Sequence, residues 1–372
     1  MKIAIIIYSM AGGGAERVSS LLSNEWANQG HEVSIITFTG QELDAYALSA
    51  AISRISIAGN VVNNSRLGFI FNNVSRLFRL RKVLKELKPD VAIGMMTASA
   101  VTTLVATLGM KTKILVSERT HPPLSPVGRA WTILRKYLYA RAHKVVVQSK
   151  ETLAWLNKEI PAACGALIPN PVLIPLPQTT PIVCIDEIVA EGRKVVLAVG
   201  RMDRQKQFHC LIQAFSQLAT LYPDWDLIIL GQGEQRHALQ ELIQENKLEH
   251  RIKMPGRAGN MADWYMRAQL YVMSSSVEGF PNTLIEAMAH GCPVISYDCD
   301  TGPRDIIRNG LDGLLVSPVG DINQLKFSIE SMMENDELRN KMGKRAMEVR
   351  ERFSYQKVVA MWERQFLENT KG

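Results

Sequence analysis

Short apolar runs rich in β-branched residues alternate with longer amphipathic stretches along the first half of the chain. The runs KIAIII, EVSIITF, VAIGM, KILVS and KVVVQ each fit a strand that is buried on both faces. The stretches between them are long enough for helices that return the chain to the same end of a sheet. This alternation predicts repeated strand–helix–strand units and a parallel sheet.

A proline-rich segment interrupts the alternation near the middle of the chain. Residues 169–183 read PNPVLIPLPQTTPIV, a composition that no helix tolerates, and strand-like runs resume in KVVLAVG, WDLIILG and AQLYVMSS. The pattern predicts an α/β protein with two Rossmann-like domains whose parallel sheets face each other across a cleft. We expect an N-terminal domain at 1–170, a linker at 171–193, a second domain at 194–352 and, at 353–372, a helix that packs back on the first domain.

Three features bear on the compartment. The five cysteines are scattered without metal-binding spacing, which favours a reducing environment. The uncharged stretch 91–110 is diluted by Thr, Ser, Gly and Ala, so we expect a strand and a helix there rather than a membrane span. The N-terminal apolar run shows no cleavage site and is expected to be the first strand, not a signal peptide. A cytoplasmic location follows from these expectations.

The charge is distributed unevenly. Residues 1–176 contain 20 Lys and Arg against 10 Asp and Glu, whereas the remainder contains 23 basic and 26 acidic residues. The basic first half predicts an anionic partner: phospholipid, nucleic acid or a phosphorylated substrate.

The stretch EGFPNTLIE, residues 278–286, places two glutamates around a predicted helix start. Asn282 or Thr283 can cap this helix beside Pro281, and its first N–H groups form an anion site after a strand. Glu286 can accept hydrogen bonds from the vicinal hydroxyls of a ribose, and Glu278 would lie nearer the reacting end of the ligand. The motif predicts a nucleotide-sugar pocket; the alternative is an exposed helix residue and a loop charge.

A second element lies after the strand KVVLAVG, in the sequence GRMDRQK. Arg201 and Lys206 fall between this strand and the next helix. Arginine with its planar fork and lysine with its point charge can together neutralise a diphosphate leaving group.

The segments GRMDRQK, LGQGEQR, PGR, EGFPNTLIEAMAHGCPVI and NGLDGLLV, in this order, resemble the group 4 retaining glycosyltransferases of the GT-B fold. The resemblance implies that Arg201 and Lys206 bind the donor diphosphate. It implies that Glu278 contacts the transferred sugar and Glu286 holds the ribose. The other implied donor contacts are Pro281, Asn282, Thr283, Gly231, Gly233 and, near the base, Arg257. The implied chemistry keeps the anomeric configuration and needs no protein nucleophile, no metal and no cofactor.

The first half supplies candidates for the acceptor side. Gly13 and Gly14 lie in the loop AGGGAER, which suits close approach of a phosphate or sugar but is not GxGxxG, so we exclude a dinucleotide site. Many family members carry a histidine after the fourth strand, where this chain reads LVSERTHPP. Glu118 occupies that position and His121 follows, so both are candidates for the sugar or acceptor vicinity. The SERTHP form and the glycine loop resemble members that extend lipid-linked oligosaccharides, including N-acetylgalactosaminyl transferases.

Residues 66–90 form a predicted basic amphipathic helix with leucines at helical spacing. Its charges fit an anionic membrane surface or the diphosphate of a polyprenyl-linked acceptor. The residues proposed for this contact are Arg76, Arg79, Lys82 and Lys85. A second basic stretch with Trp131 and Tyr137, residues 129–144, would extend the same face. The alternative is an ordinary helix with a solvated basic face.

These observations predict a retaining glycosyltransferase that works at the inner face of the plasma membrane in bacterial surface-glycan or glycoprotein-glycan assembly. It would move a hexose or N-acetylhexosamine, with GalNAc in α linkage as the leading choice, from a UDP-sugar donor to a polyprenyl-diphosphate-linked glycan. A soluble GT-B epimerase or sucrose-type synthase would leave the basic helix without a purpose. A nucleic-acid-binding protein would leave Glu278 and Glu286 unexplained, so no nucleic-acid partner is expected. The triplets at 224–226 and 298–300, both Asp-x-Asp, are not expected to bind metal.

Overall fold

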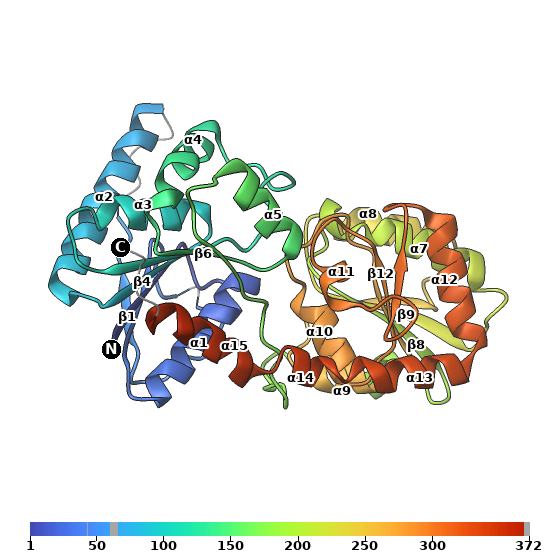
Figure 1. Cartoon of the computed structure of the whole chain (residues 1–372). Coiled ribbons are helices and arrows are strands. Elements are labelled where there is room, and N and C mark those ends of the chain that lie inside the picture. The colour runs from blue at the N-terminus through green and yellow to red at the C-terminus, as the bar shows by residue number, and fades with distance from the viewer. Residues whose placement is uncertain (43, 60–65, 368–372) are drawn as a thin grey trace. The chain divides into compact units, whose positions relative to one another are not determined.

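The computed structural model of the chain describes residues 1–42, 44–59 and 66–367, with side chains for all of these except residues 66–71. Contacts divide the chain into two compact units (Figure 1), Met1–Pro171 with Gln356–Gly372, and Val172–Tyr355. The proline-rich segment expected as a linker belongs to the second unit. There Val172 and Val189 are buried, and Thr179 N donates to Gly259 O at 3.1 Å.

The first unit contains a seven-stranded parallel sheet in the order β3-β2-β1-β4-β5-β6-β7. Its strands are β1 (Lys2–Ile7), β2 (Glu32–Thr37), β3 (Ser53–Ser56), β4 (Val91–Met95), β5 (Lys113–Ser117), β6 (Lys144–Val147) and β7 (Gly165–Leu167). The central strands are β-branched and buried along nearly their whole length, because helices cover both faces of the sheet.

Helices α1 and α15 cover one face of this sheet, and α2 to α5 cover the other (Figure 1). Their bounds are α1 (Gly14–Asn28), α2 (Arg66–Leu87), α3 (Thr97–Ala106), α4 (Arg129–Leu138), α5 (Lys150–Glu159) and α15 (Tyr355–Leu367), with a 3₁₀ turn η1 (Tyr139–Arg141) after α4. The C-terminal helix packs through Phe366, whose ring lies 5.1 Å from that of Trp26 on α1.

The uncharged stretch 91–110 forms β4 and α3, as its composition predicts. Within the described part of the chain, no helix combines the length and apolar character needed to cross a bilayer.

The second unit contains a six-stranded parallel sheet in the order β10-β9-β8-β11-β12-β13. Its strands are β8 (Lys194–Val199), β9 (Trp225–Leu230), β10 (Ile252–Gly256), β11 (Leu270–Met273), β12 (Val294–Tyr297) and β13 (Leu314–Val316). Its helical segments are α6 (Ile185–Ile188), η2 (Arg204–Lys206), α7 (Phe208–Leu218), α8 (Arg236–Glu245), α9 (Met261–Arg267), α10 (Asn282–Ala289), α11 (Pro303–Ile306), α12 (Ile322–Glu334), α13 (Asp336–Ala346) and α14 (Val349–Arg352). Two parallel sheets flanked by helices confirm the predicted α/β class.

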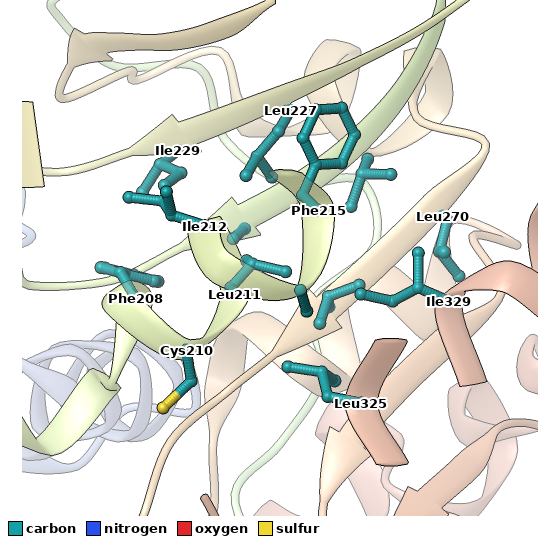
Figure 2. Packing of buried hydrophobic residues seen from close by; sticks show 14 of the residues in the cluster. Phe208, Cys210, Leu211, Ile212, Phe215, Leu227, Ile229, Leu270, Leu325 and Ile329 are labelled. Atoms are coloured by element: carbon teal, nitrogen blue, oxygen red, sulfur yellow. The ribbon is translucent and has the colours of Figure 1, made fainter. Parts of the chain in front are cut away.

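Separate apolar cores lie on the two faces of the second sheet. In one of them, α7 presents Phe208, Leu211, Ile212 and Phe215, a spacing that places them on one helical face (Figure 2). These side chains pack against strand β9 and helix α12. Because α7 is held in this way, the loop that joins β8 to α7 has a fixed end point.

Replacing Phe215 by alanine should lower the free energy of unfolding of the second unit by about 3–5 kcal/mol, because the ring is fully buried and leaves a cavity. Phe327→Ala is the matched control, since Phe327 on α12 is exposed and should change stability by less than about 0.5 kcal/mol. Hydrogen exchange of amides in α7 and β9 measures both. Equal effects of the two substitutions would contradict this packing.

Candidate active site

In the second sheet the strand order reverses at β8: the chain first adds strands on one side of β8 and then continues on its other side. The strands β9 and β10 lie on one side of β8, and β11, β12 and β13 lie on the other. At such a reversal the loops that follow the two central strands diverge, and open α/β sheets bind ligands in the crevice at these carboxyl ends. The loops 200–207 and 274–281, after β8 and β11, therefore form the candidate site.

Hydrogen bonds join these two loops to each other. Ser274 Oγ donates to Lys206 O at 2.8 Å, and Ser276 N donates to Gln205 O at 2.8 Å. Gln205 Nε2 in turn donates to Val277 O at 2.5 Å. The loops are therefore positioned together, and a ligand held by one is held in register with the other.

Lys206 and Glu278 form an ion pair between the loops, with 2.6 Å between Nζ and Oε1. The pair is largely buried, and Glu278 is only 8% exposed. Arg201 differs: its side chain is 79% exposed, and its Nε lies 3.3 Å from Asp203. The site thus holds one cation fixed by a carboxylate and a second cation whose guanidinium is open to an incoming anion.

A third loop, after β12, supports Glu278 from the other side. The Thr301 hydroxyl donates to Glu278 O, and Cys299 Sγ donates to Ser275 O at 2.9 Å. Burial raises the pKa of Cys299 to about 12, so its thiol stays protonated and cannot serve as a nucleophile here. Sequence reasoning missed Thr301, although the TGP turn after a strand at this edge was a usable signal.

Gly302, in the same loop, has φ +89°, which side-chain-bearing residues rarely adopt. A Cβ there would lie 2.9 Å from Pro281 Cδ and 3.2 Å from Glu278 Cβ. Glycine at this position therefore lets the β12 loop lie directly against the loop that carries Glu278.

The glycines after β9 permit a close approach within the protein, and their predicted contact with the donor stays a prediction. Gly231 has φ +140°, and a Cβ there would lie 1.9 Å from Gly200 O. A Cβ on Gly233 would lie 2.3 Å from Met202 O. The close approach they permit is therefore to the backbone of the β8 loop. Arg257, after β10, is exposed.

Helix α10 begins at Asn282 with Pro281 as its N-cap residue, and no side chain caps it. The predicted capping by Asn282 or Thr283 is therefore wrong, since both residues lie inside the first turn and Thr283 Oγ1 accepts a hydrogen bond from Tyr271 at 2.8 Å. The positive end of the helix dipole lies at this turn and favours an anion there.

Glu286 lies one turn into α10 and is buried. Its Oε2 accepts a hydrogen bond from the Tyr265 hydroxyl at 3.1 Å. Tyr265 comes from α9 and was not a candidate from the sequence, because nothing in MADWYMR marks it as a site residue. The ribose-binding role of Glu286 stays a prediction. It requires a ribose hydroxyl to reach the carboxylate, which is largely enclosed.

The glycine loop of the first unit lies at the corresponding reversal, between β1 and β4. Gly13 is the N-cap residue of α1 and Gly14 is its first residue. The Glu16 carboxylate folds back over Gly13, where an added Cβ would lie 2.5 Å from Glu16 Oε2. The chain's own carboxylate thus occupies the favourable anion position at this helix start.

Glu118 and His121 are both buried, and their place near the sugar or acceptor stays a prediction. Glu118 is 1% exposed and accepts hydrogen bonds from Thr97 and Tyr139, with Arg135 Nη1 3.7 Å away. Burial raises the pKa of Glu118, whereas these partners lower it. Its observed contacts hold η1, α3 and α4 on the sheet. His121 Nδ1 lies 3.0 Å from the Thr152 hydroxyl.

Arg119, which lies between Glu118 and His121 in the sequence, was not predicted as a site residue. Its side chain is buried, its Nη2 donates to Asn170 Oδ1, and its Nε and Nη1 have no hydrogen-bond partner among the described residues. Burial lowers the pKa of Arg119 to about 9, against an opposing effect of Glu16. Only its place in the SERTHP motif pointed to it.

The four basic candidates on α2 do not form one cluster. The Arg76 guanidinium lies 5.6 Å from the centre of the Tyr8 ring, just after β1. Arg79 and Lys82 instead line a hollow of about 470 Å³ beside residues 56–59, and Arg79 Nη1 donates to Ala58 O at 3.1 Å. Lys85 is exposed one turn further on.

One carboxylate of each Asp-x-Asp triplet faces an arginine. Asp226 Oδ1 lies 3.0 Å from Arg251 Nε, and Asp298 Oδ1 lies 2.9 Å from Arg304 Nε. Within the described ranges, no group of three His, Cys, Asp or Glu side chains is arranged to hold a metal ion.

The fold agrees with comparisons to known proteins. A family model described as Glycosyltransferase Family 4 matches residues 12–173, and one described as Glycosyl transferases group 1 matches residues 186–349. The two matches together span most of the chain, which therefore belongs to the glycosyltransferases.

Solved structures with the same fold include sucrose-phosphate synthase from Thermosynechococcus elongatus, with a TM-score of 0.84, 21% identity and 98% of each chain covered. Anabaena HepE, solved with UDP and glucose, has a TM-score of 0.80 and 19% identity over 99% of this chain and 100% of its own. These likenesses show the GT-B fold.

Two curated relatives match over nearly their whole length. A Campylobacter jejuni protein, 27% identical over 97% of each chain, is named GalNAc-alpha-(1->4)-GalNAc-alpha-(1->3)-diNAcBac-PP-undecaprenol alpha-1,4-N-acetyl-D-galactosaminyltransferase. An uncharacterized glycosyltransferase of Haemophilus influenzae is 26% identical over 97% of this chain and 98% of its own.

Gly302→Ala should destabilise the second unit by at least about 1 kcal/mol more than Gly310→Ala. Both glycines have positive φ, but nothing lies within 4 Å of a Cβ on Gly310, whereas one on Gly302 meets the Glu278 loop. Urea unfolding, monitored by hydrogen exchange of amides in β11 and α10, measures the difference in the free energy of unfolding between the two variants. Equal destabilisation would show that the β12 loop does not depend on this contact.

Proposed function

We propose that the protein is a retaining glycosyltransferase that transfers a hexose or N-acetylhexosamine from a UDP-sugar to a polyprenyl-diphosphate-linked glycan. The observation that carries this proposal is the joined pair of loops after β8 and β11. They bring the Lys206–Glu278 ion pair, at 2.6 Å, to the strand reversal of the second sheet, beside the exposed Arg201. A diphosphate ligand meets two cations and an uncapped helix start there.

The chemistry expected of this site is mainly electrostatic. The bond between the anomeric carbon and the phosphate oxygen breaks, and UDP leaves with the electron pair. The acceptor hydroxyl forms the new bond on the same face and passes its proton to the departing phosphate. Arg201, Lys206 and the N–H groups at the start of α10 stabilise the charge that develops on the diphosphate, and donors placed in this way contribute most of many rate enhancements. Glu278 contacts the sugar and holds Lys206 in position.

This charge stabilisation makes a metal unnecessary in the proposal. A metal usually supplies the positive charge for a diphosphate leaving group. Here that charge comes from Arg201 and Lys206, and one carboxylate of each Asp-x-Asp triplet already faces an arginine.

The names of relatives support the choice of donor and acceptor. Two Campylobacter jejuni relatives, 27% and 28% identical, are named as N-acetylgalactosaminyltransferases acting on undecaprenol-linked glycans. HepE was solved with UDP and glucose. We therefore take UDP as the nucleotide and GalNAc, in α linkage, as the leading sugar, in the assembly of a bacterial surface polysaccharide or glycoprotein glycan.

The first unit supports a lipid-linked acceptor and work at the inner face of the plasma membrane. Arg79 and Lys82 line a hollow of about 470 Å³ that can receive a diphosphate, and Lys85 is exposed beside it. Arg76 instead lies over the ring of Tyr8, the residue just after β1. Cations grouped on one amphipathic helix are also typical of contact with anionic lipid.

Product formation from a panel of UDP- and GDP-sugars with a synthetic polyprenyl-diphosphate-sugar acceptor tests the proposal. We expect transfer of one sugar in α linkage from a UDP-sugar, with and without EDTA. Glu278→Ala and Arg201→Ala should each lower kcat/KM by about 100-fold or more, because each removes a group placed at the transferred sugar or its leaving group.

Lys341→Ala is the control for the change in net charge, because Lys341 is exposed on α13 and should leave kcat/KM unchanged. Absence of both transfer and donor hydrolysis from a folded protein would overturn the proposal, as would full activity of the two site variants.

A further inference from the structure

Among the described residues, helix α4 packs on the first unit through one face. On that face Trp131 and Leu138 pack against the buried core below it. Arg135 is buried on the same face, 3.7 Å from Glu118 and with its guanidinium 4.9 Å from the centre of the Trp155 ring. These contacts hold the helix rigidly on the sheet and determine which side chains point outward.

The outward face of α4 is apolar as well. Ile133 is 58% exposed, Leu134 41% and Tyr137 74%. Tyr137 follows Ile133 by four residues and Leu134 by three, and both spacings make side chains neighbours on a helix surface, so Tyr137 joins the three into one patch. A helix that is apolar on both faces is normally covered on both, and the residues that the structure describes cover only the inner one.

The charge around this patch is entirely positive along the chain. Between Glu118, which is buried, and Glu151 there are seven basic residues and no acidic residue. Three of the basic side chains, Arg129, Lys136 and Arg141, are exposed on α4 or directly after it. An apolar patch bordered by cations is complementary to an anionic bilayer, which has apolar lipid chains beneath negatively charged headgroups.

The neighbouring helix α2 repeats this combination. Helix α3 contacts both α2 and α4, and the three lie in one layer (Figure 1). On α2, Val74 and Phe78 are exposed beside Arg79 and Lys82. Two helices of one layer thus present large apolar side chains next to cations, as helices that lie in a membrane interface do.

We propose that α4 is the membrane anchor of the first unit, with Ile133, Leu134 and Tyr137 inserted among the headgroups of an anionic bilayer and Arg129, Lys136 and Arg141 contacting lipid phosphates. This inference rests on the proposed function for its purpose, because a lipid-linked acceptor requires the enzyme to reach the bilayer surface. It assigns the apolar contact to α4, beyond the basic residues of α2.

Sedimentation of the full chain with vesicles of phosphatidylcholine containing 30% phosphatidylglycerol, as the probe, tests the anchor. The triple variant Ile133→Ser, Leu134→Ser, Tyr137→Ser should bind these vesicles about tenfold or more weakly, because it loses the inserted apolar surface. Leu221→Ser, Met266→Ser, Phe327→Ser is the matched control, since these side chains of the second unit are similarly exposed. It should bind as the original chain does.

Exchange of Arg129, Lys136 and Arg141 for glutamine should reduce the preference for anionic over pure phosphatidylcholine vesicles, and the cations of α2 should supply the remainder. Unchanged vesicle binding by the triple serine variant would overturn the proposal. A concentration-dependent dimer that the serine variant abolishes, with vesicle binding intact, would instead assign the patch to a second copy of the chain. The circular dichroism melt of each variant verifies that it is folded.

The anchor and the proposed function fail separately. Vesicle binding without sugar transfer would retain the anchor and contradict the transferase. Transfer to a short-chain, water-soluble diphosphate acceptor without vesicle binding would retain the transferase and contradict the anchor.

Discussion

The parallel pairing of β8 with β11 is the constraint on which the candidate site depends. Two further strands separate β8 from β11 in sequence. Their pairing brings the loops that follow them, which are distant in sequence, to one edge of the sheet. Apolar cores on both faces of the sheet fix the strands, because neither face tolerates a shift in register. The hydrogen bonds between the loops then fix Lys206 and Glu278 relative to each other.

A largely buried ion pair is a weak source of stability, because the loss of hydration opposes the attraction between the charges. We infer that the Lys206–Glu278 pair is retained for ligand chemistry. Glu278 keeps the ammonium group in one place before a ligand binds, so little rearrangement is needed when a diphosphate arrives. In the first unit a similar pair, Arg135 with Glu118, has a different use: it secures the helix whose other face is exposed.

The alternation of apolar runs was sufficient to predict the α/β class and the strand–helix character of 91–110, because strands buried on both faces have a distinct composition. The sequence predicted that Lys206 and Glu278 belong to one site, but not that they form an ion pair. The sequence did not indicate the burial of Glu118, because that burial depends on Thr97, Tyr139 and Arg135 from other elements. The contacts of Gly231 and Gly233 with the β8 loop, and the support from Thr301 and Gly302, likewise arise from tertiary contacts that no local pattern encodes.

The central claim is that the joined loops of the second unit bind a nucleoside diphosphate through its phosphates without a metal. Calorimetric titration of the full chain with UDP, UMP and uridine, in buffer containing EDTA, tests it most directly. We expect UDP to bind at least about tenfold more tightly than uridine, and Arg201→Ala to remove most of that difference, because charge-assisted hydrogen bonds to the diphosphate supply it. Equal binding of UDP and uridine, or no binding of either to the folded chain, would contradict the account.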